Sequence, residues 1–151
     1  MRIPARPYSP DMPISHLAVA GTSVDCADPR ELAQFYLALL GGEVLWDNDD
    51  SAAVQTMSGV RIVAQKVESY RPPVWPSAAI VHLDLDAGGR LSEAVAYALD
   101  CGATEALDQP DLRWRVLLDP AGHPFCITTE VWDDGDADAL SEQGCDDTMD
   151  R

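Results

Sequence analysis

Apolar and polar positions alternate most clearly between Trp114 and Thr129, where the sequence reads WRVLLDPAGHPFCITT. This pattern predicts two strands joined by a tight turn, because Asp, Pro and Gly occupy the positions that a type I turn prefers. The second strand alternates between two faces, with Phe125, Ile127 and Thr129 on one face and Cys126 and Thr128 on the other. We expect a buried hairpin, in which Cys126 and Thr128 either pack in the core or line a pocket.

Two segments have the apolar period of a helix. The first follows Asp28, a strong N-cap candidate with Pro29 directly after it, and ends at the Gly41-Gly42 pair. Its apolar stripe is Leu32, Phe35, Tyr36 and Leu39. The second helix is predicted over Leu91–Asp100 and ends at Cys101-Gly102.

The remaining apolar runs predict strands, which give the order strand–helix–strand–strand–strand twice. Their expected positions are His16–Cys26, Glu43–Trp46, Ala52–Met57, Val60–Val67 and Ala79–Asp86, with short strands near Thr104 and Leu107 before the hairpin. One such unit cannot cover both faces of its own sheet, so we expect two to pack together. The prediction is a single α+β domain over residues 16–132, with modules at about 16–67 and 79–132 and a Pro-rich loop at 68–77.

The composition and net charge of the chain argue against several kinds of partner and location. The chain is 46% hydrophobic and carries a formal net charge of −16, which argues against nucleic acid and anionic membranes as partners. There is no apolar run of membrane-spanning length and no signal-peptide core, so we expect a cytoplasmic protein. Residues 1–15 are read as a flexible arm and residues 133–151 as an acidic disordered tail. The four cysteines fit neither a zinc motif nor a disulfide framework and are expected to be reduced thiols.

Three ordered motifs carry a family resemblance. They are Asp28-Pro29 followed by LAQFYLALLGGE, then His82-Leu83-Asp84-Leu85, and the closing hairpin. Between about Leu17 and Glu130 the chain resembles the glyoxalase/bleomycin-resistance/extradiol-dioxygenase group, the vicinal-oxygen-chelate superfamily, especially its glyoxalase-like branch. The resemblance implies two βαβββ modules whose curled mixed sheets surround a cavity, and a homodimer. It says little about chemistry, because one fold hosts many activities.

The resemblance also implies one metal ligand from each of four strands. Those positions fall at Gly21 or Thr22, at Ala64 or Gln65, at His82 and at Cys126. Only His82 is a good ligand, with Cys126 a plausible thiol and Gln65 a weak one. No cofactor is therefore expected. The alternative is a divalent metal (Zn, Ni, Fe or Mn) held by His82, Gln65 and Cys126.

Other residues suit metal-free chemistry or binding. His82, Asp84 and Asp86 share one strand face, so His82 and Asp84 are candidate acid–base groups, although solvated charges explain the carboxylates equally well. Trp46, Trp75 and Trp114 could stack on an aromatic or cationic ligand, or simply pack in the core, and Trp75 should be the most exposed. His123, in the turn, is expected to position the loop by a hydrogen bond.

Three hypotheses follow. The first is a protein that binds a small organic molecule, cationic or aromatic, in its cavity without an intact metal site, through Gln65, His82, Cys126, Trp46, Trp75 and Trp114. The second is a metal-dependent or acid–base enzyme, a lyase, isomerase or dioxygenase. The third is a dimeric module whose cavity is vestigial.

Overall fold

The structure, a computed structural model, describes residues 19–76 and 80–129. The arm predicted at residues 1–15, the tail predicted at 133–151 and Trp132 lie outside the described residues. In the described part of the chain, no helix is long and apolar enough to cross a membrane.

The first module contains one helix and a four-stranded mixed sheet. Its elements are β1 (Thr22–Cys26), α1 (Pro29–Leu40), β2 (Gly42–Asp47), β3 (Ser51–Thr56) and β4 (Arg61–Lys66). The strand order is β1-β4-β3-β2, in which β1 and β4 are parallel and the other pairs are antiparallel.

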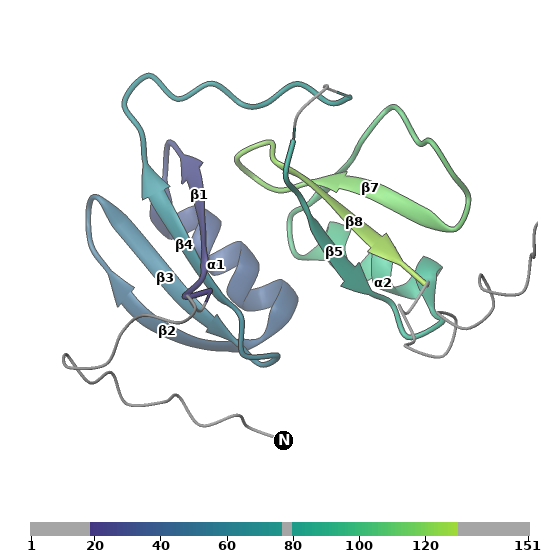
Figure 1. Cartoon of the computed structure of the whole chain (residues 1–151), viewed down its shortest axis with the longest axis horizontal. Coiled ribbons are helices and arrows are strands. Elements are labelled where there is room, and N and C mark those ends of the chain that lie inside the picture. The colour runs from purple at the N-terminus through teal and green to yellow at the C-terminus, as the bar shows by residue number, and fades with distance from the viewer. Residues whose placement is uncertain (1–18, 77–79, 130–151) are drawn as a thin grey trace, which may run out of the picture.

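The second module repeats this arrangement. Its elements are β5 (Leu83–Asp86), α2 (Leu91–Asp100), β6 (Thr104–Glu105), β7 (Trp114–Leu118) and β8 (Pro124–Thr128), in the order β5-β8-β7-β6. Figure 1 shows the two sheets side by side, each with its own helix, and a long connection between β4 and β5. The predicted α+β fold of two βαβββ modules is confirmed.

Local sequence explains the first helix. The Asp28 carboxylate accepts hydrogen bonds from the backbone N–H groups of Arg30 and Glu31, at 3.0 and 3.1 Å, and so caps the helix as predicted. The helix ends at Gly41, whose φ of 63° is favoured in glycine. The predicted bounds of α2 are also confirmed.

Two predicted strands begin too early, because a strand extends only where it has a partner. β1 begins at Thr22 rather than His16, since its neighbour β4 begins only at Arg61. β5 begins at Leu83 rather than Ala79, because its neighbour β8 starts after the turn, at Pro124.

The strand predicted near Leu107 is absent, because a side chain takes the place of a partner strand. The side-chain amide of Gln109 donates to the carbonyls of Ala106 and Val116 and accepts from the Val116 N–H. Leu107 itself is fully exposed.

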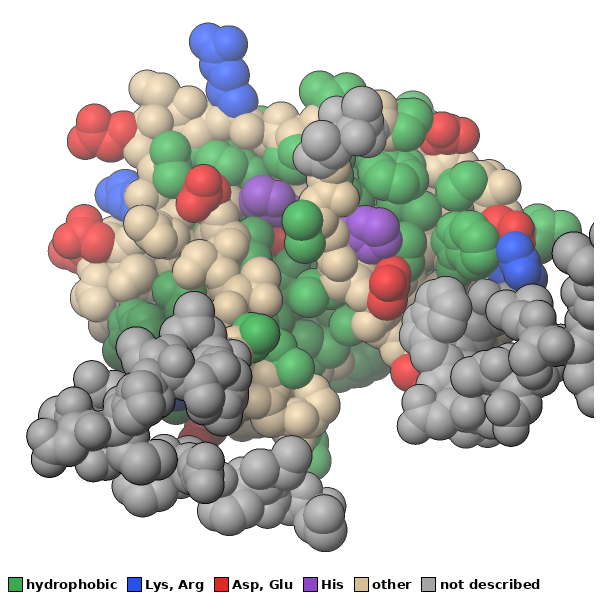
Figure 2. Space-filling model, viewed as in Figure 1, with side chains coloured by type: hydrophobic (Ala, Val, Ile, Leu, Met, Phe, Trp, Pro, Cys, Tyr) green, Lys and Arg blue, Asp and Glu red, His purple; other side chains and the backbone are tan. Residues whose placement is uncertain are grey.

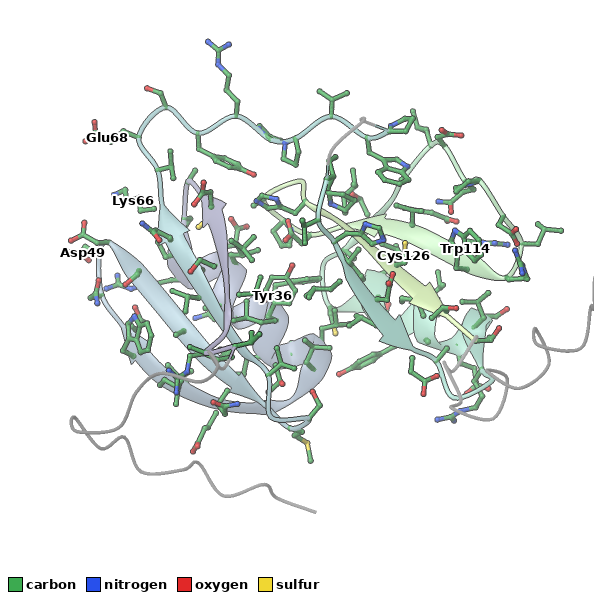
Figure 3. The ribbon with its side chains drawn as sticks, in the orientation of Figure 1. Tyr36, Asp49, Lys66, Glu68, Trp114 and Cys126 are labelled. Atoms are coloured by element: carbon green, nitrogen blue, oxygen red, sulfur yellow. The ribbon has the colours of Figure 1, made fainter. Side chains whose placement is uncertain are left out.

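The two modules share one core. Phe35 of α1 lies against Phe125 of β8, with ring centroids 6.0 Å apart, and both side chains are buried. The Tyr36 hydroxyl donates to the buried carboxylate of Asp119 across the junction, at 2.7 Å. Figure 3 shows Tyr36 between the two sheets.

The His123 side chain connects the closing turn of the second module to the first module. Its Nε2 lies 2.6 Å from the Asp25 carbonyl and 2.9 Å from the Tyr70 hydroxyl. A carbonyl only accepts, so Nε2 carries the proton. The prediction that His123 positions a loop by a hydrogen bond is confirmed.

Candidate functional site

A pocket opens on the face of the second sheet that does not pack against the helices. Its volume is about 320 Å³, within the range of small-molecule sites. The lining residues are Trp75, His82, Asp84, Pro110, Trp114, Cys126 and Thr128. The predicted alternation of β8 is confirmed, since Phe125 and Ile127 belong to the core shared with α1 while Cys126 and Thr128 line this pocket.

Strand register brings the polar groups together. Asp84 of β5 pairs directly with Cys126 of the parallel strand β8, so both side chains lie on one face. His82 stands two residues before Asp84, and its Nε2 lies 3.3 Å from Asp84 Oδ1. One nitrogen, oxygen or sulfur atom from each of these three residues lies within 4.8 Å of the others.

The thiol of Cys126 is held in its neutral form. Burial raises the pKa of Cys126 to about 11, and the charge of Asp84 and a hydrogen bond to its carboxylate act in the same direction. The thiol therefore donates to Asp84 and is a poor nucleophile at neutral pH.

Two indole rings form the walls. Trp75, in the connection between the modules, meets the His82 ring edge to face with centroids 6.3 Å apart, and its Nε1–H donates to the Asp108 carbonyl. Trp114 of β7 lies beside Cys126, as Figure 3 shows, and carries the Arg113 guanidinium 5.0 Å above its ring. Figure 2 shows histidine and hydrophobic side chains gathered on this face of the molecule.

The structure brings five of the predicted site residues to this pocket and leaves two elsewhere. Gln65 lies on β4 and Trp46 on β2, both in the first sheet, and neither lines the pocket. Trp46 is 38% exposed and Trp75 is half-buried, so the expectation that Trp75 would be the more exposed is wrong. Asp86, which was expected on the same strand face as His82 and Asp84, does not line the pocket either. Its carboxylate accepts a hydrogen bond from the Gly88 N–H. Pro110 was not predicted, since nothing in its local sequence distinguishes it from an ordinary loop residue.

Comparison with known proteins identifies the family. A family model described as a glyoxalase-like domain matches residues 21–128, which include every helix and strand of the described chain. The chain belongs to the glyoxalase-like domain family. No curated protein matches it.

Solved structures share the glyoxalase-like fold at low identity. A mutant of the fosfomycin resistance protein FosX from Listeria monocytogenes, complexed with Mn(II) and 1S,2S-dihydroxypropylphosphonic acid, is 14% identical, with a TM-score of 0.58 and 79% of this chain and 93% of that one covered. A glyoxalase/bleomycin resistance protein/dioxygenase family enzyme from Burkholderia phytofirmans is 19% identical, with a TM-score of 0.55 and coverages of 72% and 94%. A glyoxalase-related enzyme from Fulvimarina pelagi is 18% identical, with a TM-score of 0.54 and coverages of 74% and 86%.

A glyoxalase-like fold with a metal-bound neighbour raises the question of whether a metal fits here. The three donors of the pocket are an imidazole, a carboxylate and a thiol, close enough together to share one ion. This set suits zinc and similar thiophilic cations better than manganese, which favours oxygen ligands. The four-strand ligand set that the resemblance implies does not meet in this pocket, because neither Gln65 nor Thr22 is among its lining residues.

Proposed function

We propose that this glyoxalase-like protein binds a small organic molecule, aromatic and cationic, in the pocket between Trp75 and Trp114. The observation that supports this most directly is the combination of two indole walls with an acidic floor at Asp84. Indole faces attract cations, and a carboxylate adds an opposite charge. The net charge of the chain, −16, also favours a cationic ligand.

The pocket is open rather than filled by side chains, which does not favour the hypothesis of a vestigial cavity. Its apolar walls and few polar groups are the usual composition of a small-molecule site. The guanidinium over Trp114 occupies one face of that ring, so an incoming cation has Trp75 and Asp84 as its nearest attractive groups.

Calorimetric titration with a library of aromatic ammonium compounds tests the proposal. Trp75→Ala should weaken binding about tenfold or more, since a desolvated cation–π contact contributes about 2 kcal/mol. Trp114→Ala should also weaken binding, because it removes the ring on which the aromatic part of the ligand stacks. Trp46→Ala is the matched control, because Trp46 lies outside the pocket in the first sheet, and should leave Kd unchanged. Equal affinities for all three variants would contradict the proposal.

A second candidate is acid–base catalysis of a lyase or isomerase type. It is supported by the distance of 3.3 Å between His82 Nε2 and Asp84 Oδ1 beside the pocket, since a paired carboxylate orients an imidazole for proton transfer. His82→Ala should then abolish turnover of a pocket ligand while the circular dichroism spectrum stays unchanged. Retained turnover would remove His82 from this role.

The homodimer and the cytoplasmic location stay predictions. Light scattering after size-exclusion chromatography would measure the first, and cell fractionation the second.

A further inference from the structure

We propose that the groove between the two sheets binds an extended peptide segment of a partner protein, which adds one strand between β1 and β5. This goes beyond the proposed function, because it uses the backbone edges of two strands rather than the indole walls of the pocket.

The groove lies between the inner edges of the two sheets. In the described part of the chain, β1 pairs only with β4 and β5 only with β8, so both are edge strands. Figure 1 shows these edges facing each other across the junction, with the two strands running in opposite directions. The space between them has a volume of about 320 Å³. It is lined by four consecutive residues of β1, by Val81–Leu83 and by Tyr36, His123 and Pro124. Successive side chains of a strand point to opposite faces, so a run of consecutive lining residues means that the backbone edge itself forms the wall.

The hydrogen-bond pattern shows which backbone groups of β1 face the groove. The Cys26 carbonyl accepts from the Val67 N–H, at the end of the parallel pair of β1 and β4. In a parallel pair, residues that bond to the partner strand alternate with residues whose N–H and C=O groups point the other way. Ser23 and Asp25 are therefore the residues whose backbone groups point away from β4. The Asp25 carbonyl agrees with this direction, since it accepts from His123 of the second module.

The same rule identifies the groove-facing groups of β5. The Ala87 N–H donates to the Thr128 carbonyl at the end of β8, so the odd-numbered residues of β5 bond to β8. His82 and Asp84 alternate with them, and their backbone groups point to the groove. An inserted strand would therefore find N–H and C=O groups on both sides, from Ser23 on β1 and from His82 and Asp84 on β5.

The inner edges lack the features that usually protect an edge strand. Bulges, very short strands, prolines and lysines are common means of preventing a foreign strand from pairing. The outer edge of the first sheet, β2, has a bulge between Val44 and Trp46, and the outer edge of the second sheet, β6, is two residues long. In contrast, β1 and β5 contain no proline and no lysine, and their register with β4 and β8 is regular. The inner edges are thus open to strand addition, a recurring mode of peptide recognition.

Side chains on the two faces of the groove select the partner segment. On one face, Val24 and Leu83 pack against the core and Tyr36 is buried, so an inserted strand would place small or apolar side chains there. On the other face, Asp25 and Asp84 are exposed carboxylates that attract cations. Because the side chains of a strand alternate between faces, the partner segment should alternate apolar residues with lysine or arginine.

The test is calorimetric titration of the whole chain with an acetylated, amidated hexapeptide in which valine and lysine alternate. This peptide should bind, and a peptide of the same composition with a block of valines followed by a block of lysines should bind about tenfold more weakly or worse, because it cannot match both faces. Failure of the alternating peptide to bind, or equal affinities for the two peptides, would overturn the proposal.

Backbone methylation of the peptide tests whether both edges pair. Methyl groups on the valine nitrogens remove the donors on one side of the inserted strand, and methyl groups on the lysine nitrogens remove those on the other side. Each change should weaken binding about tenfold or more, because it removes hydrogen bonds and places methyl groups in the ladder. If only one of the two methylated peptides lost affinity, the segment would add to a single edge and insertion between two would be wrong.

Variants of Ser23 separate the backbone edge from its side chain. Ser23→Pro removes an N–H that faces the groove and that β4 does not use, so it should weaken peptide binding about fivefold or more while the circular dichroism spectrum stays unchanged. Ser23→Ala keeps this N–H and should bind the peptide more tightly than Ser23→Pro does. Equal affinities of the two variants would contradict pairing at Ser23.

Amide hydrogen exchange of the unmodified chain gives a result that does not depend on how Ser23→Pro folds. When the alternating peptide is added, the Ser23 and Asp84 amides should exchange more slowly, and the Val24 and Leu85 amides, which already face β4 and β8, should not change. Unchanged exchange at both Ser23 and Asp84, or slower exchange confined to β2, would overturn the proposal.

The two proposals can fail separately. Peptide binding with no binding of an aromatic ammonium compound would overturn the proposed function alone. Binding of such a compound with no peptide binding would overturn strand insertion alone.

Discussion

Asp119 is a buried carboxylate that joins the closing turn to the first module. One of its oxygens accepts from the backbone N–H groups of Ala121 and His123, both at 2.9 Å, and the other accepts from the Tyr36 hydroxyl. Asp119 is 3% exposed, so its charge is satisfied by these three donors rather than by bulk water. Burial, and then the charge of Asp119, raise the pKa of Tyr36 far above its usual range, which keeps the hydroxyl a donor.

We expect Tyr36→Phe to destabilise the protein by about 2 kcal/mol, because it leaves one oxygen of a buried carboxylate without its donor. Tyr97→Phe makes the same chemical change at an exposed site, where the hydroxyl donates to the Ala38 carbonyl. It should cost less than about 1 kcal/mol. Urea unfolding measures the free energy of unfolding of both variants. Equal losses would show that the buried Tyr36–Asp119 hydrogen bond stabilises the protein no more than the exposed one.

The pKa of Asp111 predicts how the stability of the fold changes at low pH. Hydrogen bonds from Arg113 lower the pKa of Asp111 to about 2. A carboxyl whose pKa is lower in the folded state stabilises the fold above its unfolded pKa and loses that contribution as the pH falls toward 2. Arg113→Gln should raise the pKa of Asp111 toward its ordinary value of 3.8, as followed by carbon NMR of the carboxyl group. An unchanged pKa in the variant would contradict this origin of the shift.

At the scale of elements, the junction between α1 and β2 depends on Gly42. Its φ is 120°, and a Cβ built there would lie 2.0 Å from the Gln55 carbonyl oxygen of the neighbouring strand. We expect Gly42→Ala to cost more than about 3 kcal/mol, since both backbone strain and a backbone clash oppose it.

Gly59→Ala is the control for that change. Gly59 also has positive φ, 90°, but an added Cβ meets no atom within 4 Å. It should cost only about 1 kcal/mol, from strain alone. Thermal unfolding of the two variants separates clash from strain, and equal losses would contradict the predicted close approach.

Elements with a local chemical signal could be predicted from the sequence. Asp28 identifies the start of α1 because an N-cap side chain bonds only to the backbone of the residues that directly follow it. The turn at Asp119 is equally local. Strand ends could not be predicted in the same way, because they depend on where a distant partner begins, as β5 does on Pro124.

The candidate site shows the same limit. The alternation of β8 placed Cys126 on the pocket face, but a shift of one residue in the β5–β8 register would put Phe125 opposite Asp84 instead. Periodicity does not fix that register. Nor does it say how the two sheets lie relative to one another, so the prediction grouped Gln65 and Trp46 of the first sheet with pocket residues from which the structure separates them.

At the scale of the whole molecule, the shared core predicts one cooperative unfolding transition. The core cluster includes Leu32 and Phe35 from the first module and Leu117 and Phe125 from the second. Phe125→Ala should therefore lower the stability of both modules together, by about 3–5 kcal/mol.

Single-tryptophan variants can measure this cooperativity. Trp46 reports on the first module and Trp114 on the second. Their fluorescence should give the same urea midpoint, both before and after Phe125→Ala. Two separate midpoints would show that the modules unfold independently.

The segment between β4 and β5 is both a connection and a wall of the pocket. Tyr70 is tied to the closing turn through the Ala121 carbonyl, and Trp75 stands over His82. Neither sheet depends on the length of this segment for its own hydrogen bonds. Insertions or deletions here would therefore be tolerated by the fold and would act first on selectivity, so related chains that diverge in ligand preference should differ most in this stretch and least in the strands beside it.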